Sequence, residues 1–127
     1  MLARFAFVAC ALALLVASGC GPAKLKESRT LNLDAGDVKS IDLLAQPKAQ
    51  KITVEFSSAE EVAVFVFKEA DAKGTSGLET AEANKSKALT SKKSKGETFT
   101  VDVPENTAVR VIFSAIKKTD VTAKVTN

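Results

Sequence analysis

Apolar and polar residues alternate through most of residues 29–127, and this period constrains the fold more than any other feature of the chain. Residues 52–56 (ITVEF) and 99–103 (FTVDV) show the pattern most clearly. Successive side chains of a β-strand point to opposite faces, so the period predicts strands with one buried face. Residues 62–67 (VAVFVF) are apolar throughout, which predicts a central strand covered on both faces.

Turn-forming residues divide this pattern into short runs. Residues 34–37 (DAGD), 45–49 (AQPKA), 104–107 (PENT) and 117–120 (KKTD) each interrupt the alternation. Short strands at this spacing predict an all-β fold, a single antiparallel β-sandwich of seven or eight strands that is jelly-roll or immunoglobulin-like. The phenylalanines of this region are expected to lie in its core: Phe56, Phe65, Phe67, Phe99 and Phe113.

The polar segment from residue 69 to residue 96 leaves two alternatives open. Ser76 and Glu79 match the capping box that begins a helix. However, the apolar spacing after Leu78 is poor for a helix, and a loop followed by a strand near residues 87–92 fits equally well. The sequence therefore predicts either a short helix or a further strand in this segment.

The beginning of the chain does not show this alternation and contains one continuous apolar segment. Residues 5–17 (FAFVACALALLVA) follow Arg4 and contain no charge. A helix of this length would span roughly 20 Å, less than the roughly 30 Å hydrocarbon core of a bilayer. The length is typical of the apolar part of a signal peptide. Three small residues, Ala17-Ser18-Gly19, then precede Cys20.

This stretch resembles the lipobox of bacterial lipoproteins, in which a peptidase cuts before a cysteine that carries diacylglycerol. The resemblance implies a signal peptide over residues 1–19 and lipid on Cys20. After the cysteine, residues 21–28 (GPAKLKES) are expected to form a short polar tether. Ala17 departs from the leucine that is most frequent in this family. The alternatives are an ordinary secretion signal with a chance cysteine, or a cytosolic chain with an apolar start.

The expected location follows from the same residues. Lipid on Cys20 would anchor the chain in a cell membrane almost permanently, because each buried methylene contributes about 0.8 kcal/mol. Gly21 stands where aspartate resembles the inner-membrane retention signal, so the outer membrane is favoured in a host that has one. Cys10 would leave with the signal peptide, and Cys20 alone cannot form an intramolecular disulfide.

Composition argues against several kinds of chemistry. Cleavage before Cys20 would leave 17 basic and 15 acidic side chains, a balance that does not indicate a nucleic-acid partner. The chain contains no histidine, so Ser-His-Asp and Cys-His catalysis is excluded. With Cys20 lipidated, no thiol or imidazole would remain for zinc, copper or haem, and no cofactor is expected. We expect a protein that is not an enzyme.

Two kinds of enzyme and one metal remain as alternatives. A Ser–Lys pair is conceivable, but both residues are abundant. Glu60 and Glu61 could serve a two-carboxylate glycosidase, yet the chain has no tyrosine or tryptophan to hold a sugar ring. Calcium could bind acidic side chains near the turns, but turn chemistry explains them equally well and no metal site is predicted. These acids are Asp34, Asp37, Asp42, Glu69 and Asp71.

Five lysines with no acid between them form the clearest candidate contact surface: Lys85, Lys87, Lys92, Lys93 and Lys95. They could contact anionic lipid or an anionic polymer, with each lysine near such a surface contributing about 1 kcal/mol. The alternative is a solvated segment that keeps the domain soluble. Acidic residues flank the cluster on both sides.

Residues 29–126 also resemble, faintly, the small β-sandwiches of the bacterial pre-peptidase C-terminal type. The matching parts are the turn at residues 33–37, the strand at residues 62–68, and the final pair FTVDVP and VRVIF. That family implies an accessory domain without catalytic residues. The sequence thus favours a membrane-anchored binding or structural module of the cell envelope that contacts an envelope protein or an anionic polymer. The alternatives are a carrier of lipid or another small molecule, and a histidine-free hydrolase.

Overall fold

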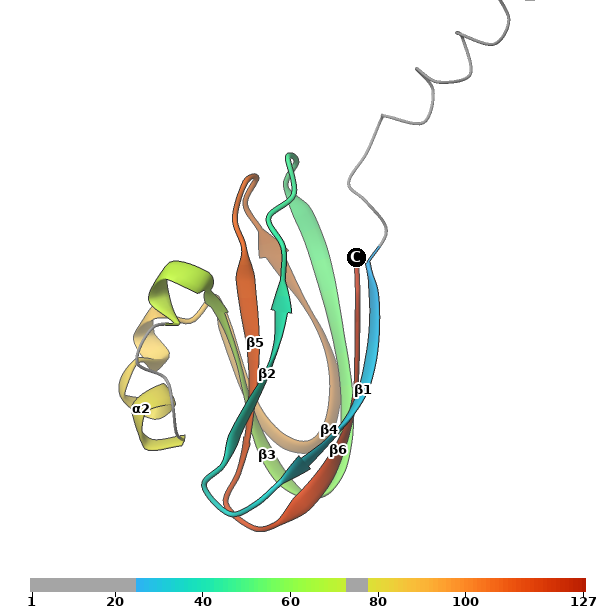
Figure 1. Ribbon diagram of the computed structural model, residues 1–127, viewed down its shortest axis with the longest axis vertical. Helices are drawn as coiled ribbons and strands as arrows, with labels where there is room; N and C mark the ends of the chain where they lie inside the picture. Colours follow the sequence, from blue (N-terminus) through green and yellow to red (C-terminus); the bar gives the residue numbers. More distant parts are fainter. Residues whose placement is uncertain (1–24, 73–77) are drawn as a thin grey trace, which may run out of the picture.

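Six antiparallel strands make up most of the protein in the computed structural model, which describes residues 25–72 and 78–127. The strands are β1 (Lys26–Leu33), β2 (Val38–Leu43), β3 (Gln50–Lys68), β4 (Thr90–Val103), β5 (Val109–Ala115) and β6 (Thr119–Thr126). Three short helices lie between β3 and β4: η2 (Glu69–Asp71), α2 (Leu78–Ala83) and η3 (Lys85–Lys87). The strands form one sheet that curls until it is nearly barrel-shaped (Figure 1). The predicted all-β antiparallel fold is confirmed.

Strand β3 connects the two halves of this sheet. Its first part, Thr53–Ser58, pairs with β6, and its second part, Val62–Lys68, pairs with β5. β4 follows β3 along both parts. The sheet therefore folds into two layers that share β3 and β4, one completed by β6 and β1 and the other by β5 and β2.

The structure has six described strands, and not the predicted seven or eight, because β3 and β4 each combine two segments that were predicted as separate strands. β3 contains both residues 52–56 and residues 62–67, and β4 extends over 14 residues. A register shift between Ser57 and Val62 lets β3 bend without ending. Gly96 pairs with Ser57 at this bend, where an added Cβ would lie only 3.2 Å from the Phe56 carbonyl oxygen. The close approach explains why a glycine occupies this position in β4.

Alternate side chains from all six strands fill the space between the layers. Phe56 belongs to this core and meets Phe99 and Phe113 edge to face, with ring centroids 6.4 and 6.3 Å apart. Such pairs contribute about 0.5–1.5 kcal/mol beyond the burial of their surface. Phe65 and Phe67 are also buried, but on the outer face of β3. The prediction that all five phenylalanines belong to the core is confirmed.

A second, smaller cluster covers the outer face of the layer that contains β5. Phe65, Phe67 and Ile112 pack there with Ala72, which follows η2, and Ala81 of α2. Figure 1 shows α2 outside this layer. Residues 62–67 are all buried, so the predicted double coverage is confirmed.

The segment from residue 69 to residue 96 contains both of the predicted alternatives. A short helix, α2, is followed by the first residues of β4. Leu89, which precedes β4, packs partly against the core between the layers. Ser76, the predicted capping residue, lies outside the described residues.

The barrel has two ends that differ in what they carry. The upper end in Figure 1 consists of Leu25, the loop at residues 44–49, the loop at residues 104–108 and Asn127. There the Leu25 backbone N–H donates to Oδ1 of Asn127 at 2.6 Å, so the first and last described residues are joined. β1 already begins at Lys26 and takes in the last three residues of the predicted tether.

The lower end consists of the turn at residues 34–37, the β3 bend at residues 58–61 and the turn at residues 116–118. Gly36 has a φ of 79°, a conformation that glycine adopts without strain, and its N–H donates to the Ala115 carbonyl at 2.8 Å. This bond joins the β1–β2 turn to the end of β5.

We predict that Phe113→Ala lowers the free energy of unfolding by about 3–5 kcal/mol, because a fully buried ring is replaced by a cavity. Ile116→Ala is the matched control, since Ile116 is 56% exposed and should cost less than about 1 kcal/mol. Urea unfolding followed by circular dichroism measures both values. Equal losses in the two variants would contradict the described core.

Candidate functional site

Four of the five lysines of the predicted contact surface line two hollows. Lys85, on η3, and Lys92 and Lys93, on β4, line a hollow of about 60 Å³ together with Ser91 and Glu82. Lys95 lines a different hollow at the lower end. Lys87, the last residue of η3, lines neither of these hollows. Three of the five lysines therefore line one hollow, and Lys95 lines a neighbouring one that shares the Lys93–Glu61 ion pair.

The strand that carries most of these lysines lies at an edge of the sheet. Among the described strands, β4 pairs with β3 alone, so no described strand pairs with the backbone N–H and C=O groups on its other side. Such an edge can pair with the edge of another molecule, and lysine side chains along it oppose that pairing. The lysines at positions 92, 93 and 95 are therefore placed where they would protect the edge of β4.

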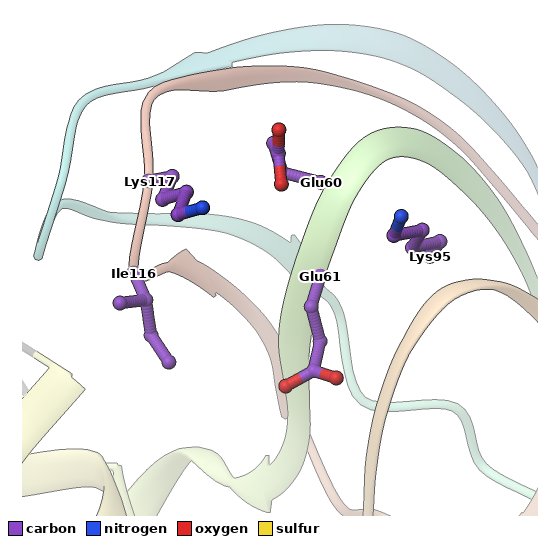
Figure 2. A pocket seen from close by; sticks show the side chains of 5 residues that line it. All are labelled: Glu60, Glu61, Lys95, Ile116 and Lys117. Carbon is purple, nitrogen blue, oxygen red and sulfur yellow. The ribbon is translucent and has the colours of Figure 1, made fainter.

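A hollow of about 240 Å³ at the lower end is the second candidate site. Glu60 and Glu61 come from the bend of β3, Lys95 from β4, and Ile116 and Lys117 from the turn before β6. Figure 2 shows Ile116 and Lys117 on one side of the β3 bend and Lys95 on the other. The Ser58 hydroxyl donates to the Lys95 carbonyl at 3.1 Å and so ties the bend to β4.

The charges around this hollow are of both signs and only weakly paired. Nζ of Lys93 lies 3.9 Å from a carboxylate oxygen of Glu61, and both side chains are about half exposed. An exposed ion pair of this kind contributes little to stability, about 0–1 kcal/mol. Ile116 adds an exposed apolar side chain. Carboxylates, ammonium groups and one apolar group at a protruding end suit contact with a protein surface.

The acidic residues that could have served calcium do not gather around one position. Asp34 and Asp37 bond within their own turn, where the Asp37 N–H donates to the Asp34 carbonyl at 3.0 Å. Asp42 lies on β2 and accepts a 2.7 Å hydrogen bond from Nε of Arg110. Within residues 25–72 and 78–127, no group of three acidic residues is placed to hold a metal ion. Glu69 and Asp71 belong to η2.

The most specific residue of the sequence, Cys20, lies outside the described residues, as do the predicted signal peptide and residues 21–24 of the tether. In the part of the chain that is described, no helix is both long and apolar enough to span a bilayer.

Two exposed apolar side chains were not singled out from the sequence. Leu44 is 84% exposed because β2 ends at Leu43, one residue before the break that was predicted at residues 45–49. Ile116 is exposed because it follows the end of β5 at Ala115. The sequence could have indicated both exposed positions, because each residue directly precedes a segment that was predicted to be a turn or loop.

No protein-family model matches the chain, and no curated protein sequence matches it. Among solved structures, the chain is similar to the crystal structure of the Yersinia pseudotuberculosis-derived mitogen, with a TM-score of 0.50. The match covers 84% of this chain and 86% of the mitogen chain at 6% sequence identity. A likeness at this identity concerns the fold alone, and it agrees with the β-rich architecture described above.

We predict that replacing Lys92, Lys93 and Lys95 with threonine increases self-association, because the open edge of β4 loses its charges while keeping its backbone groups. Sedimentation velocity of the protein without lipid measures this. The control removes the same number of charges elsewhere: Lys117, Lys118 and Lys124. Equal association of the two triple variants would show that net charge, and not the edge of β4, controls solubility.

Proposed function

We propose that this chain is a lipid-anchored, non-catalytic binding module of a bacterial cell envelope. The observation that carries the proposal is the short distance along the chain between Cys20, at the end of the lipobox-like stretch, and Lys26, where β1 begins. Six residues span at most about 20 Å when fully extended. A lipid on Cys20 would therefore hold the folded domain against the membrane, which raises its effective concentration for partners there.

The proposed contact surface is the hollow lined by Lys85, Lys92 and Lys93. Its partner would be an anionic polymer or an acidic region of an envelope protein, since three lysines and Ser91 line the hollow and Glu82 is the one acidic residue among them. The weak Lys93–Glu61 pair would give way easily to such a partner. The lysines would thus both protect the edge of β4 and select for negative charge.

We favour this proposal over a carrier of apolar cargo because side chains fill the interior of the domain. A carrier needs an interior cavity, whereas apolar side chains from all six described strands occupy the space between the layers. The lysine-lined hollow and the lower hollow both open at the surface and are lined largely by charged side chains.

For the anchor, we predict that Cys20→Ala abolishes labelling by radioactive palmitate and moves the protein from the membrane fraction to the soluble or uncleaved fraction. Cys10→Ala is the matched control and should be labelled like the unchanged protein, because Cys10 lies within the segment expected to be removed. A lipid-labelled, membrane-bound Cys20→Ala protein would refute the proposal.

For the contact surface, we predict that Lys85→Glu with Lys92→Glu weakens binding to polyphosphate at least about tenfold at low salt, because each lysine contributes about 1 kcal/mol. Isothermal titration calorimetry measures the change, which should shrink as salt is raised. Lys51→Glu with Lys124→Glu carries the same net charge and should weaken binding much less. Equal weakening in both variants would refute a localised site.

A further inference from the structure

The loop between β2 and β3 exposes an unusually apolar surface at the upper end of the barrel. Within residues 25–72 and 78–127, the large hydrophobic side chains that are exposed are Leu44, at 84%, and Ile116, at 56%, and they lie at opposite ends. Leu44 begins the loop at residues 44–49, whose only charged residue is Lys48. Its other exposed members are Ala45, Pro47 and Ala49.

This loop lies next to the place where the described chain begins. Leu44 lines a hollow of about 140 Å³ together with Leu25. Two acidic residues, Glu27 and Asp42, line the same hollow, and Asp42 accepts a hydrogen bond from Arg110. The Gln46 carbonyl accepts a 2.7 Å hydrogen bond from the Asn106 N–H, which joins the loop to the neighbouring loop at this end. Figure 1 shows the β2–β3 loop projecting at the end where β1 begins.

We infer that the loop at residues 44–49 is a second membrane contact, with Leu44 inserted into the interfacial region of the bilayer that holds the lipid anchor. The inference rests on the proposed anchoring of Cys20. Leu25 is five positions after Cys20, a reach of at most about 18 Å, so the upper end would be held close to the bilayer. Removal of the exposed Leu44 side chain from water favours the contact.

The charges of the loop suit the same surface. Lys48 would lie near the headgroups, where a lysine beside anionic lipid is favourable, and residues 44–49 contain no acid that lipid phosphates would repel. At the lower end, Ile116 lines a hollow with two glutamates and two lysines, so the distance from the anchor, and not the charge, distinguishes the two ends. The inferred orientation therefore turns the lower end away from the membrane.

The test uses the lipidated protein in vesicles of phosphatidylethanolamine and phosphatidylglycerol. In the proposed mature protein Cys20 carries lipid and Cys10 is absent, so one introduced cysteine is the only free thiol for the dye NBD. Ala45→Cys keeps Leu44 in place and reports on the upper end. Lys117→Cys reports on the lower end. Both positions are exposed, so neither substitution should disturb the core.

We expect NBD at position 45 to shift to shorter emission wavelengths and to be quenched by spin-labelled lipid, while NBD at position 117 behaves as in water. Adding Leu44→Ser to the Ala45→Cys protein should reduce the shift. Co-sedimentation with vesicles but no shift at position 45, or an equal shift at position 117, would overturn this inference and leave the anchor intact. Absence of lipid labelling and of co-sedimentation would overturn the proposed function and the inference together.

Discussion

The structure depends on the continuity of β3 through its bend. This one strand pairs with β6 before the bend and with β5 after it, so each layer takes its central strand from the same stretch of chain. The bend is possible because β3 shifts register after Ser57 and because Gly96 admits the Phe56 carbonyl oxygen at close range. The aromatic contacts of Phe56 with Phe99 and Phe113 then join the layers just beside the bend. Hydrogen bonding and core packing therefore reinforce each other at a single place.

The alternation of apolar and polar residues was sufficient to predict the fold class, the core phenylalanines and the doubly covered strand at residues 62–67. It was not sufficient to predict six strands, because the polar residues 57–61 (SSAEE) are typical of a turn and only the pairing with β4 shows that they bend a continuous strand. Leu44 shows the same limit. The predicted break begins at residue 45, whereas β2 ends at Leu43 and leaves Leu44 exposed.

The candidate sites show what proximity along the chain can and cannot predict. The five lysines are close in sequence, but only three of them line the same hollow, and Lys95 lines another. The lower hollow could not be predicted, because its residues come from β3, β4 and the turn before β6. Cys20 differs from both, since its expected role follows from a local motif that needs no tertiary structure. Proteins that share a fold can differ in function, so the likeness to the mitogen does not indicate what this chain does.

The position of β1 has a mechanical consequence. β1 lies at an edge of its layer and pairs with β6 along its whole length, from Lys26 opposite Thr126 to Leu33 opposite Thr119. Tension between an anchor before Lys26 and a partner held at the lower end would pull β1 lengthwise against β6. The hydrogen bonds of the ladder would then be loaded together in shear and would not open one after another. A domain attached in this way resists detachment by force better than one attached through a strand that can be peeled from its end.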